Sequence, residues 1–441
     1  MTVQACASAP ENLSDTNLVG SAQSTATSVL AKTTTQTQVA QVQATQSQAT
    51  AKTQNAKTQN TAQSQAARFE AWKQTFKTQA KARGYSATLL DRMIDPAKIN
   101  PKAIERNKTQ PEFTRPIWEY IDGAASSVRV SKGKTKLSEN EALFSGIEAR
   151  YGVPRYILTA IWGLESSYGN ILGTHDIVSS LATFAFEGRR QKFGTEQLYA
   201  VLDLVKNGDV RPEQLTGSWA GAMGMTQFIP TTFRDYAVDY DKNGNKDLWK
   251  SKGDALGSAA NYLKRSGWKA GEPVVAEVRL PRTFDYSLAD GQKKSVADWV
   301  ALGAAPYNGM AFSPSANPLM AKLLIPTGGN GPKFLTFKNY DAIKKYNNST
   351  SYALGITSLS DAFRDRNTIT APWPKADLPL SFTDRKRLQE SLTRLGYDTK
   401  GVDGQIGPNS RKAIRAFQAA NQMPADGYAT PNLLKRVLAK T

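Results

Sequence analysis

The sequence predicts a mainly α-helical protein with a small β-containing insert, followed by a separate three-helix bundle at its C-terminus. Three observations lead to this fold class. Apolar residues recur at helical spacing over most of residues 68–270, short strand-like runs appear between residues 274 and 338, and capping signals divide residues 381–441 into helices. A chain of 441 residues is long enough for more than one domain.

Residues 1–67 have a composition unlike the rest of the chain. They are rich in Thr, Gln, Ala and Ser, contain no aromatic residue, and carry a near repeat over residues 51–60. Such a segment buries too little apolar area to offset the entropy of the chain, so we expect a disordered tail or tether.

Cys6, the single cysteine, lies in this tail. The run Val3-Gln4-Ala5-Cys6 resembles the start of a mature bacterial lipoprotein, although Gln4 departs from that pattern. No charged segment followed by an apolar one opens the chain, so no signal peptide is visible. Two hypotheses remain open: a start codon further upstream with Cys6 as a lipid-anchored residue in the outer membrane, or a free thiol in a disordered tail.

A large domain is expected at residues 68–370. Phe69, Trp72 and Phe76 recur at helical spacing, and Ser86 can cap the next helix. The second half of this domain contains the β-containing insert and then returns to helix. Its predicted elements are strands at 274–280 and 323–326, helices at 339–346 and 352–365, and a linker at 371–380.

The pattern over residues 381–441 predicts a separate small unit. A first helix stops at Gly396, Pro408 suits the first turn of a second helix, and a third helix carries Leu433, Leu434 and Val437. A bundle of three short helices can bury only a small hydrophobic core. We therefore expect a binding module here rather than a second catalytic domain.

The charge and the scarcity of Cys and His exclude several classes of function. The formal net charge is +18, which favours a polyanionic partner without choosing among nucleic acid, membrane and acidic wall polymer. No nucleic-acid-binding signature is present, so we expect no nucleic-acid partner. One cysteine rules out an intramolecular disulfide or a cysteine zinc cluster, and His175, the single histidine, has no G-x-S-x-G motif beside it.

Glu165 is the first candidate for catalysis. It lies near the C-terminal end of a helix that follows Pro154 and is apolar almost all round, which indicates a buried helix. Burial raises the pKa of a carboxyl group and keeps it protonated near neutral pH, as a general acid for glycosidic cleavage requires. The alternative is a structural glutamate paired with Arg189 or Arg190.

A second segment, residues 218–230, contains small residues around Met225, Gln227 and Phe228. Glycines allow close approach of the backbone to a ligand, an amide offers donors and an acceptor to sugar groups, and Met and Phe can face apolar sugar surfaces. A helix–loop–helix packing motif would also use these glycines.

Together, residues 163–169 (GLESSYG) and 221–228 (GAMGMTQF) resemble lytic transglycosylases with a lysozyme-like catalytic domain, in particular the membrane-bound lytic murein transglycosylase B family. The resemblance covers roughly residues 68–367. Further agreeing segments are Gln110-Pro111-Glu112-Phe113, Tyr151-Gly152-Val153-Pro154, Leu181-Ala182-Thr183, Ala259-Ala260-Asn261-Tyr262 and Tyr346-Asn347. It implies that Glu165 is the catalytic acid/base. The expected substrate-binding residues are Ser218, Met223, Gln227, Phe228, Tyr262, Tyr346 and Asn347.

The resemblance also accounts for a missing second carboxylate. Most glycosidases use two, and the only nearby candidate, Glu187, is better explained by pairing with a following arginine. A lytic transglycosylase cleaves the β-1,4 bond between N-acetylmuramic acid and N-acetylglucosamine with one acid/base, forms a 1,6-anhydromuramyl end and requires no cofactor. A hydrolytic muramidase and an inactive peptidoglycan-binding scaffold are the alternatives.

The run from Asp239 to Lys250 resembles an EF-hand loop. Its expected ligands are Asp239, Asp241, Asn243, Asn245 and Asp247, with Gly244 at the sixth position. The twelfth position, normally an acidic ligand, is Lys250. Two readings stay open: weak calcium binding with help from Asp254, or a turn whose Asx side chains satisfy backbone groups.

The C-terminal unit resembles the peptidoglycan-binding domain of wall hydrolases. The segments that carry this resemblance are Leu388-Gln389, Leu395-Gly396-Tyr397, Val402-Asp403-Gly404, Ile406-Gly407, Ala413-Ile414, Phe417-Gln418 and Asp426-Gly427. It implies glycan strands of peptidoglycan as the partner and the periplasm as the location. We expect the protein to be a monomer.

Overall fold

A computed structural model describes residues 64–108, 115–188 and 190–441 of the chain. These residues form two compact units, 64–99 and 100–441. The predicted tail up to residue 63, including Cys6, lies outside the described residues, and so do the segment 110–113 and Arg189. No helix in the described part of the chain is long and apolar enough to cross a membrane.

The first unit consists of a helix over residues 64–82 and helix α2 (Ala87–Ile94). The helix already includes residues 64–67, which composition had placed in the tail. The rings of Phe69 and Trp72 stack at 5.4 Å between centroids, and those of Trp72 and Phe76 at 5.5 Å, which confirms the predicted amphipathic helix. Ser86 caps α2 by accepting the Leu89 N–H, as predicted.

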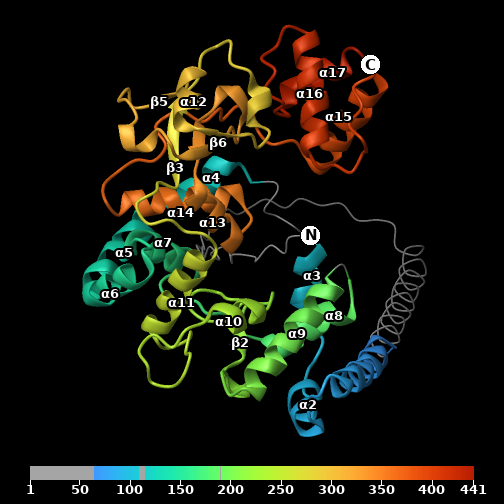
Figure 1. Cartoon of the computed structure of the whole chain (residues 1–441). Helices are drawn as coiled ribbons and strands as arrows, with labels where there is room; N and C mark the ends of the chain where they lie inside the picture. Colours follow the sequence, from blue (N-terminus) through green and yellow to red (C-terminus); the bar gives the residue numbers. More distant parts are fainter. Residues whose placement is uncertain (1–63, 109–114, 189) are drawn as a thin grey trace, which may run out of the picture. The chain divides into compact units, whose positions relative to one another are not determined.

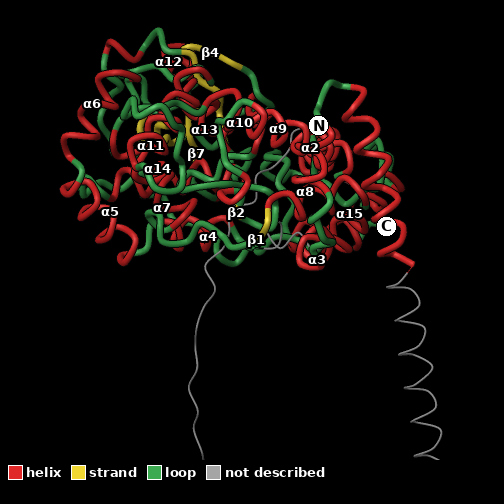
Figure 2. The backbone as a smooth tube through the Cα atoms, turned by 90° about the horizontal axis from the view of Figure 1, so that it is seen from below, coloured by secondary structure: helices red, strands yellow, loops and turns green. Residues whose placement is uncertain are grey.

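The second unit begins with a series of helices (Figure 1). In chain order they are α3 (Pro101–Lys108), α4 (Ile117–Ala124), α5 (Ser127–Glu139), α6 (Glu141–Tyr151), α7 (Arg155–Ser166), α8 (Ile177–Phe186), α9 (Gln191–Lys206), α10 (Pro230–Tyr236) and α11 (Lys252–Arg265). A short antiparallel pair, β1 (His175–Asp176) with β2 (Thr216–Gly217), lies apart from the main sheet (Figure 2).

Helix α7 is almost entirely buried because α5, α6, α11 and α14 (Thr350–Ala362) pack around it. Nine of its twelve residues are buried. The helix ends at Ser167, which adopts a left-handed conformation with φ 52°. Gly163 cannot be replaced without a shift, since an added Cβ would lie 2.7 Å from the ring of Tyr168. The apolar sequence of this helix therefore correctly predicted a central, buried element.

The insert is a five-stranded antiparallel sheet in the order β4-β6-β7-β3-β5. Its strands are β3 (Val275–Arg279), β4 (Lys293–Ser295), β5 (Ala305–Pro306), β6 (Met320–Leu324) and β7 (Lys333–Thr336). Helix α12 (Val296–Ala301) packs beside it, and the Trp299 indole donates to the carbonyl of Ala321 at 3.0 Å. The strand predicted at 274–280 is confirmed as β3, whereas the one predicted at 323–326 overlaps only the last two residues of β6, which begins at Met320. The other three have two to four residues, too short for a visible alternation.

Helix α13 (Lys338–Tyr346) and α14 follow the sheet and return the chain to α7, in agreement with the two helices predicted there. The segment expected to be a linker is tied to the insert. The N–H groups of Thr370 and Ala371 donate to the Glu277 carboxylate at 2.8 and 2.9 Å. The Trp373 ring lies 6.2 Å from that of Trp118.

The C-terminal part of the second unit is the predicted three-helix bundle, formed by α15 (Phe382–Arg394), α16 (Pro408–Ala420) and α17 (Pro431–Leu438) (Figure 1). Its small core gathers side chains from all three helices. The largest contributors are Leu388, Leu392, Ile414, Phe417, Leu433 and Val437. Gly396 has φ 89° just after α15, which explains why the helix stops there.

Candidate active site

Glu165 lies in the last turn of α7 and is 5% exposed. Its partner is the hydroxyl of Tyr352 in α14, which donates to Oε1 at 2.6 Å. Ser349 caps α14 by accepting the N–H of Tyr352, so the start of the helix fixes the position of this tyrosine. The carboxyl group is therefore held between two buried helices.

Burial raises the pKa of Glu165 from 4.5 to about 7, and the hydrogen bond from Tyr352 opposes this rise. Desolvation disfavours the charged form, whereas a donor favours it, and here desolvation dominates. Within the described residues no other carboxylate and no arginine contributes to the shift. Glu165 therefore exchanges its proton near neutral pH without the second carboxylate that most glycosidases place nearby.

The structural alternative for Glu165, pairing with an arginine, finds no support in the described residues. The Arg190 guanidinium lies over the ring of Phe193 at 4.5 Å and over that of Phe184 at 5.0 Å. Arg189 lies outside the described part of the chain. Glu187 ends α8 and takes no part in the pKa shift of Glu165.

A tight turn over residues 217–228 carries Ser218 and Gln227. The Ser218 hydroxyl accepts the N–H groups of Ala220 and Ala222 at 3.3 and 3.0 Å, which folds the turn back on itself. Gly224 has φ 69°, and a Cβ there would lie 2.6 Å from the Leu248 carbonyl oxygen. The glycine is therefore required by both conformation and space.

Gln227 has a left-handed backbone with φ 50°, unusual for a residue that is not glycine. Its amide nitrogen donates to the carbonyls of Gly224 at 2.9 Å and Leu172 at 3.3 Å. These bonds fix the amide, and within the described residues its Oε1 accepts no hydrogen bond. The side chain thus offers a ligand an acceptor, whereas the sequence had suggested both donors and an acceptor.

Phe228, Tyr262 and Tyr346 form an aromatic wall. The ring of Phe228 lies 5.9 Å from each tyrosine ring, and the two tyrosine rings meet edge-on at 5.2 Å. The Tyr346 hydroxyl donates to the carbonyl of Thr226 at 2.6 Å, which joins the wall to the turn. Burial, and the charge of Glu165 next, raise the pKa of Tyr346 well above its usual value.

Two further predicted residues have different environments. Asn347 follows α13 directly after Tyr346 and is 6% exposed, at the edge of the aromatic wall. Met223 is completely buried and bridges Phe228 through backbone hydrogen bonds in the turn. The Met223 side chain therefore packs inside the protein and exposes no surface that a substrate could contact.

Tyr352 was missed by sequence reasoning. The signals around it, a serine cap followed by an apolar helix, identify a helix start but not a partner. Its contact with Glu165 joins residues 187 positions apart, so only the tertiary structure reveals it.

The acidic loop brings Asp239, Asp241 and Asp254 together. One carboxylate oxygen from each lies within 4.8 Å of the others. Asp254 is fully buried, and burial raises its pKa. Among the described residues no lysine or arginine forms an ion pair with these three carboxylates, although Lys250 follows in the sequence.

The same loop contains the expected Asx turns. Asp239 accepts the N–H groups of Asn243 and Gly244, and Asp247 accepts those of Trp249 and Lys250. The Asn243 side chain accepts the N–H of Asn245 at 2.9 Å. Both hypotheses for the loop, weak calcium binding and a turn stabilised by Asx side chains, therefore have a structural basis.

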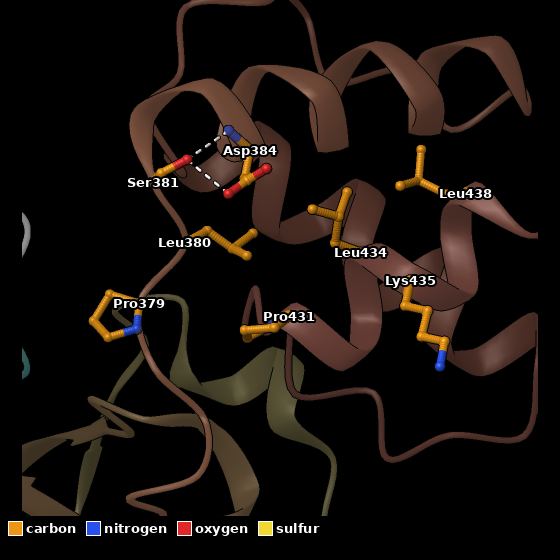
Figure 3. A pocket seen from close by; sticks show the side chains of 8 residues that line it. All are labelled: Pro379, Leu380, Ser381, Asp384, Pro431, Leu434, Lys435 and Leu438. Atoms are coloured by element: carbon orange, nitrogen blue, oxygen red, sulfur yellow. Dashed lines mark hydrogen bonds between the residues drawn. The ribbon is translucent and has the colours of Figure 1, made fainter. Parts of the chain in front are cut away.

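The C-terminal bundle contains a pocket of about 300 Å³ between the start of α15 and α17 (Figure 3). Leu380, Leu434 and Leu438 give it an apolar surface, and Asp384 and Lys435 lie at its edge. The Ser381 hydroxyl donates to the Asp384 carboxylate at 2.7 Å, so this acid is partly satisfied within the helix.

Comparison with known families gives two matches. The model described as Transglycosylase SLT domain matches residues 68–361, and the model described as Putative peptidoglycan binding domain matches residues 383–437. The first covers well over half of the chain.

Individual relatives agree. Membrane-bound lytic murein transglycosylase B of Escherichia coli is 34% identical over 219 residues, which cover 48% of this chain and 57% of that protein. The match thus spans little more than half of the E. coli protein. SltB3 from Pseudomonas aeruginosa, solved in complex with NAG-anhNAM-pentapeptide, is 47% identical, with a TM-score of 0.81 over 84% of this chain and 99% of that one. E. coli Slt35, in complex with calcium, is 28% identical, with a TM-score of 0.57 over 66% and 92%.

Proposed function

The chain belongs to the transglycosylase SLT domain family, and from this premise we propose that it is a lytic transglycosylase with Glu165 as its single acid/base. The substrate would be the β-1,4 bond between N-acetylmuramic acid and N-acetylglucosamine in peptidoglycan. One observation carries the proposal: a buried carboxyl group with a pKa of about 7, held by Tyr352 and without a second carboxylate beside it in the described residues.

The reaction follows from the chemistry of one carboxyl group. Protonated Glu165 gives its proton to the glycosidic oxygen while the bond from this oxygen to the muramyl anomeric carbon breaks. The resulting carboxylate, stabilised by the Tyr352 hydroxyl, then takes the proton of the muramyl 6-hydroxyl as that oxygen bonds to the anomeric carbon. The product is a 1,6-anhydromuramyl end, Glu165 is protonated again, and no water is consumed.

The turn over residues 217–228 and the aromatic wall would bind the sugars. The turn is joined to α7, which carries Glu165, by the Ser166 hydroxyl, which donates to the carbonyl of Met225 at 2.6 Å. The Ser218 hydroxyl, which accepts two N–H groups, retains its own proton to donate, and Gln227 offers Oε1 as an acceptor. Asn347 adds an amide at the edge of the aromatic wall, whose Tyr262 and Tyr346 would face sugar rings. Such fixed polar groups stabilise charge that develops during bond cleavage.

Mass spectrometry of muropeptides from a purified digest tests the reaction. Anhydro ends are expected, whereas hydrated reducing ends would establish a muramidase instead. The Glu165→Gln variant addresses the inactive scaffold, because unchanged wall lysis by this variant would show that Glu165 is not the acid. DNA binding that survives physiological salt would contradict the expected absence of a nucleic-acid partner.

We propose the division 68–370 for the catalytic domain, 371–380 for the linker and 381–441 for the peptidoglycan-binding domain. The family match at 383–437 and the separate core of the bundle support it. A wall-binding module would raise the local concentration of the enzyme on glycan strands.

For the location we propose the periplasm, because peptidoglycan, the proposed substrate, lies there; the E. coli relative, a murein transglycosylase, is named membrane-bound. Anchoring through Cys6 is the finer hypothesis, and mass spectrometry of the natural N-terminus tests it. An unmodified Cys6 behind Met1 would overturn the anchor without affecting the enzymatic proposal.

We further propose that the acidic loop binds calcium weakly, as a structural ion. Three convergent carboxylates, from Asp239, Asp241 and Asp254, suit an oxygen-seeking cation, and the Slt35 relative was solved with calcium. Lys250 in place of the twelfth-position acid reduces the expected affinity. Calorimetry with calcium tests the proposal: absence of heat at millimolar metal would leave the Asx turns as the whole explanation.

A further inference from the structure

We propose that a positively charged pocket beside the aromatic wall binds the carboxylates of the peptide carried by peptidoglycan. This inference rests on the proposed function and extends it from the sugars to the peptide. The pocket has a volume of about 380 Å³ and is lined mainly by Tyr236, Tyr262, Arg265, Lys344 and Lys345, with Asp341 at its side.

The pocket shares Tyr262 with the aromatic wall. The Tyr262 ring lies 4.7 Å from that of Tyr236 inside the pocket and 5.2 Å from that of Tyr346 in the wall. Tyr346 is in turn close enough to Glu165 for the carboxylate to affect its pKa. Tyr236, Tyr262 and Tyr346 therefore form a continuous series of side chains from the pocket towards the acid/base.

The three cations of the pocket are held in place by backbone carbonyls rather than by acids. Arg265 donates to the carbonyl of Asp235 at 2.6 Å, Lys344 to that of Asn348 at 3.1 Å, and Lys345 to that of Ser266 at 2.8 Å. Among the described residues none of the three forms an ion pair. Each retains N–H groups that these bonds do not use, so the pocket carries oriented positive charge from three cations, with Asp341 as the one acid among its lining residues.

Asp341 does not cancel this charge, because it already has a partner. Lys322 donates to its two carboxylate oxygens at 3.0 and 3.3 Å. Burial lowers the pKa of Lys344, with Asp341 opposing the change, so an anion bound beside this ammonium would relieve its desolvation. The charges that line the pocket, three cations and one acid already paired with Lys322, favour a negatively charged ligand.

The peptide is the part of peptidoglycan that fits this chemistry. Its carboxylates match guanidinium and ammonium groups, whereas the hydroxyl and N-acetyl groups of the sugars need no cation, and the lactyl carboxyl group of N-acetylmuramic acid is neutral because it forms the amide bond to the peptide. A solved relative, SltB3, was crystallised with NAG-NAM-pentapeptide, which gives a defined probe of this kind.

Calorimetry of the full chain carrying Glu165→Gln, chosen to prevent turnover, compares NAG-NAM-pentapeptide with peptide-free NAG-NAM whose lactyl carboxyl group is capped as a methylamide. The pentapeptide ligand should bind more tightly, and higher salt should reduce the difference. Adding Arg265→Gln or Lys344→Gln should weaken binding of the pentapeptide ligand about three- to tenfold, as the loss of a typical hydrogen bond does. Binding of the capped NAG-NAM should stay the same.

Lys264→Gln is the matched control. Lys264 is the neighbour of Arg265 on α11, also donates to a backbone carbonyl, that of Arg150 at 3.1 Å, and does not line the pocket. It should leave both affinities unchanged. Thermal melting of each variant checks that a loss of binding does not come from unfolding.

Equal weakening for both ligands, or no weakening for either, would overturn the peptide pocket. If wild-type enzyme still releases anhydro ends in that case, the proposed function stands and only this inference fails. If the wild-type enzyme forms no anhydro ends, the proposed reaction fails. A pentapeptide-selective loss in the Arg265 and Lys344 variants would then still establish the pocket as a peptide-binding site.

Discussion

The hydroxyl of Tyr352 donates to Oε1 of Glu165 at 2.6 Å, between two helices that are far apart in the sequence. This bond and the burial of the carboxyl group act in opposite directions on the same pKa, and burial dominates. These two opposing effects set the pH at which the proposed acid loses its proton. Four predictions depend on this site and on the turn over residues 217–228.

The activity should fall as pH rises through about 7. Glu165 starts each turnover protonated and recovers its proton at the end, so only the protonated enzyme enters the reaction. The pH profile of kcat/KM should therefore be flat below the pKa and decrease about tenfold per pH unit above it. A profile that stays level up to pH 9 would contradict the assignment of Glu165 as the acid.

Tyr352→Phe should move this decrease to higher pH. The substitution removes the donor that lowers the pKa of Glu165, so the carboxyl group stays protonated at higher pH. The rate on the low-pH plateau should drop about tenfold, since the developing carboxylate loses one hydrogen bond. Tyr340→Phe is the control: its hydroxyl lies 3.4 Å from that of Thr350 and does not contact Glu165, so the profile should not move.

Glu165→Gln should lower activity at least about a thousandfold and stabilise the protein at neutral pH. The folded-state pKa of about 7 exceeds the unfolded value of 4.5. The free energy of unfolding of the wild type, relative to that of the variant, is therefore largest below pH 4.5, the pKa in the unfolded state. It decreases as the pH rises to about 7, the pKa in the folded state. The difference should reach about 3 kcal/mol in the free energy of unfolding. Urea unfolding at pH 4.5 and pH 8 measures it; equal differences at both values would show that the buried carboxyl group has an ordinary pKa.

Gly224→Ala should destabilise the protein and reduce activity together. The residue needs a positive φ, and its Cβ would strike the Leu248 carbonyl oxygen, which displaces the turn that carries Gln227. Gly208→Ala provides a matched control with φ 76° and open space around the new Cβ. The control should cost about 1 kcal/mol from backbone strain alone, with full activity. A Gly224→Ala variant as active and stable as the control would contradict the turn geometry.

The sequence by itself determined the broad organisation. The apolar run before Glu165 is enough to place that residue on a buried helix, because a helix without a polar face has no stable position at the surface. Gly396 and Pro408 delimit the helices of the C-terminal bundle through backbone conformation, which is a local property. The strands β3 and β6 were long enough to show their pattern, whereas β5, with two residues, was not.

The tertiary structure decided which groups meet. The Tyr352 hydroxyl contacts Glu165, and Asp254 lies beside Asp239 and Asp241. Tyr262 belongs to both the aromatic wall and the positively charged pocket. The sequence listed Met223 among the sugar-binding residues, but packing buries it completely. Contacts of this kind depend on how distant elements pack, and a shift of one residue in a helix turns a side chain by 100°. Local patterns fix which face of an element is apolar, while the pairing of individual polar groups across elements follows only from the assembled fold.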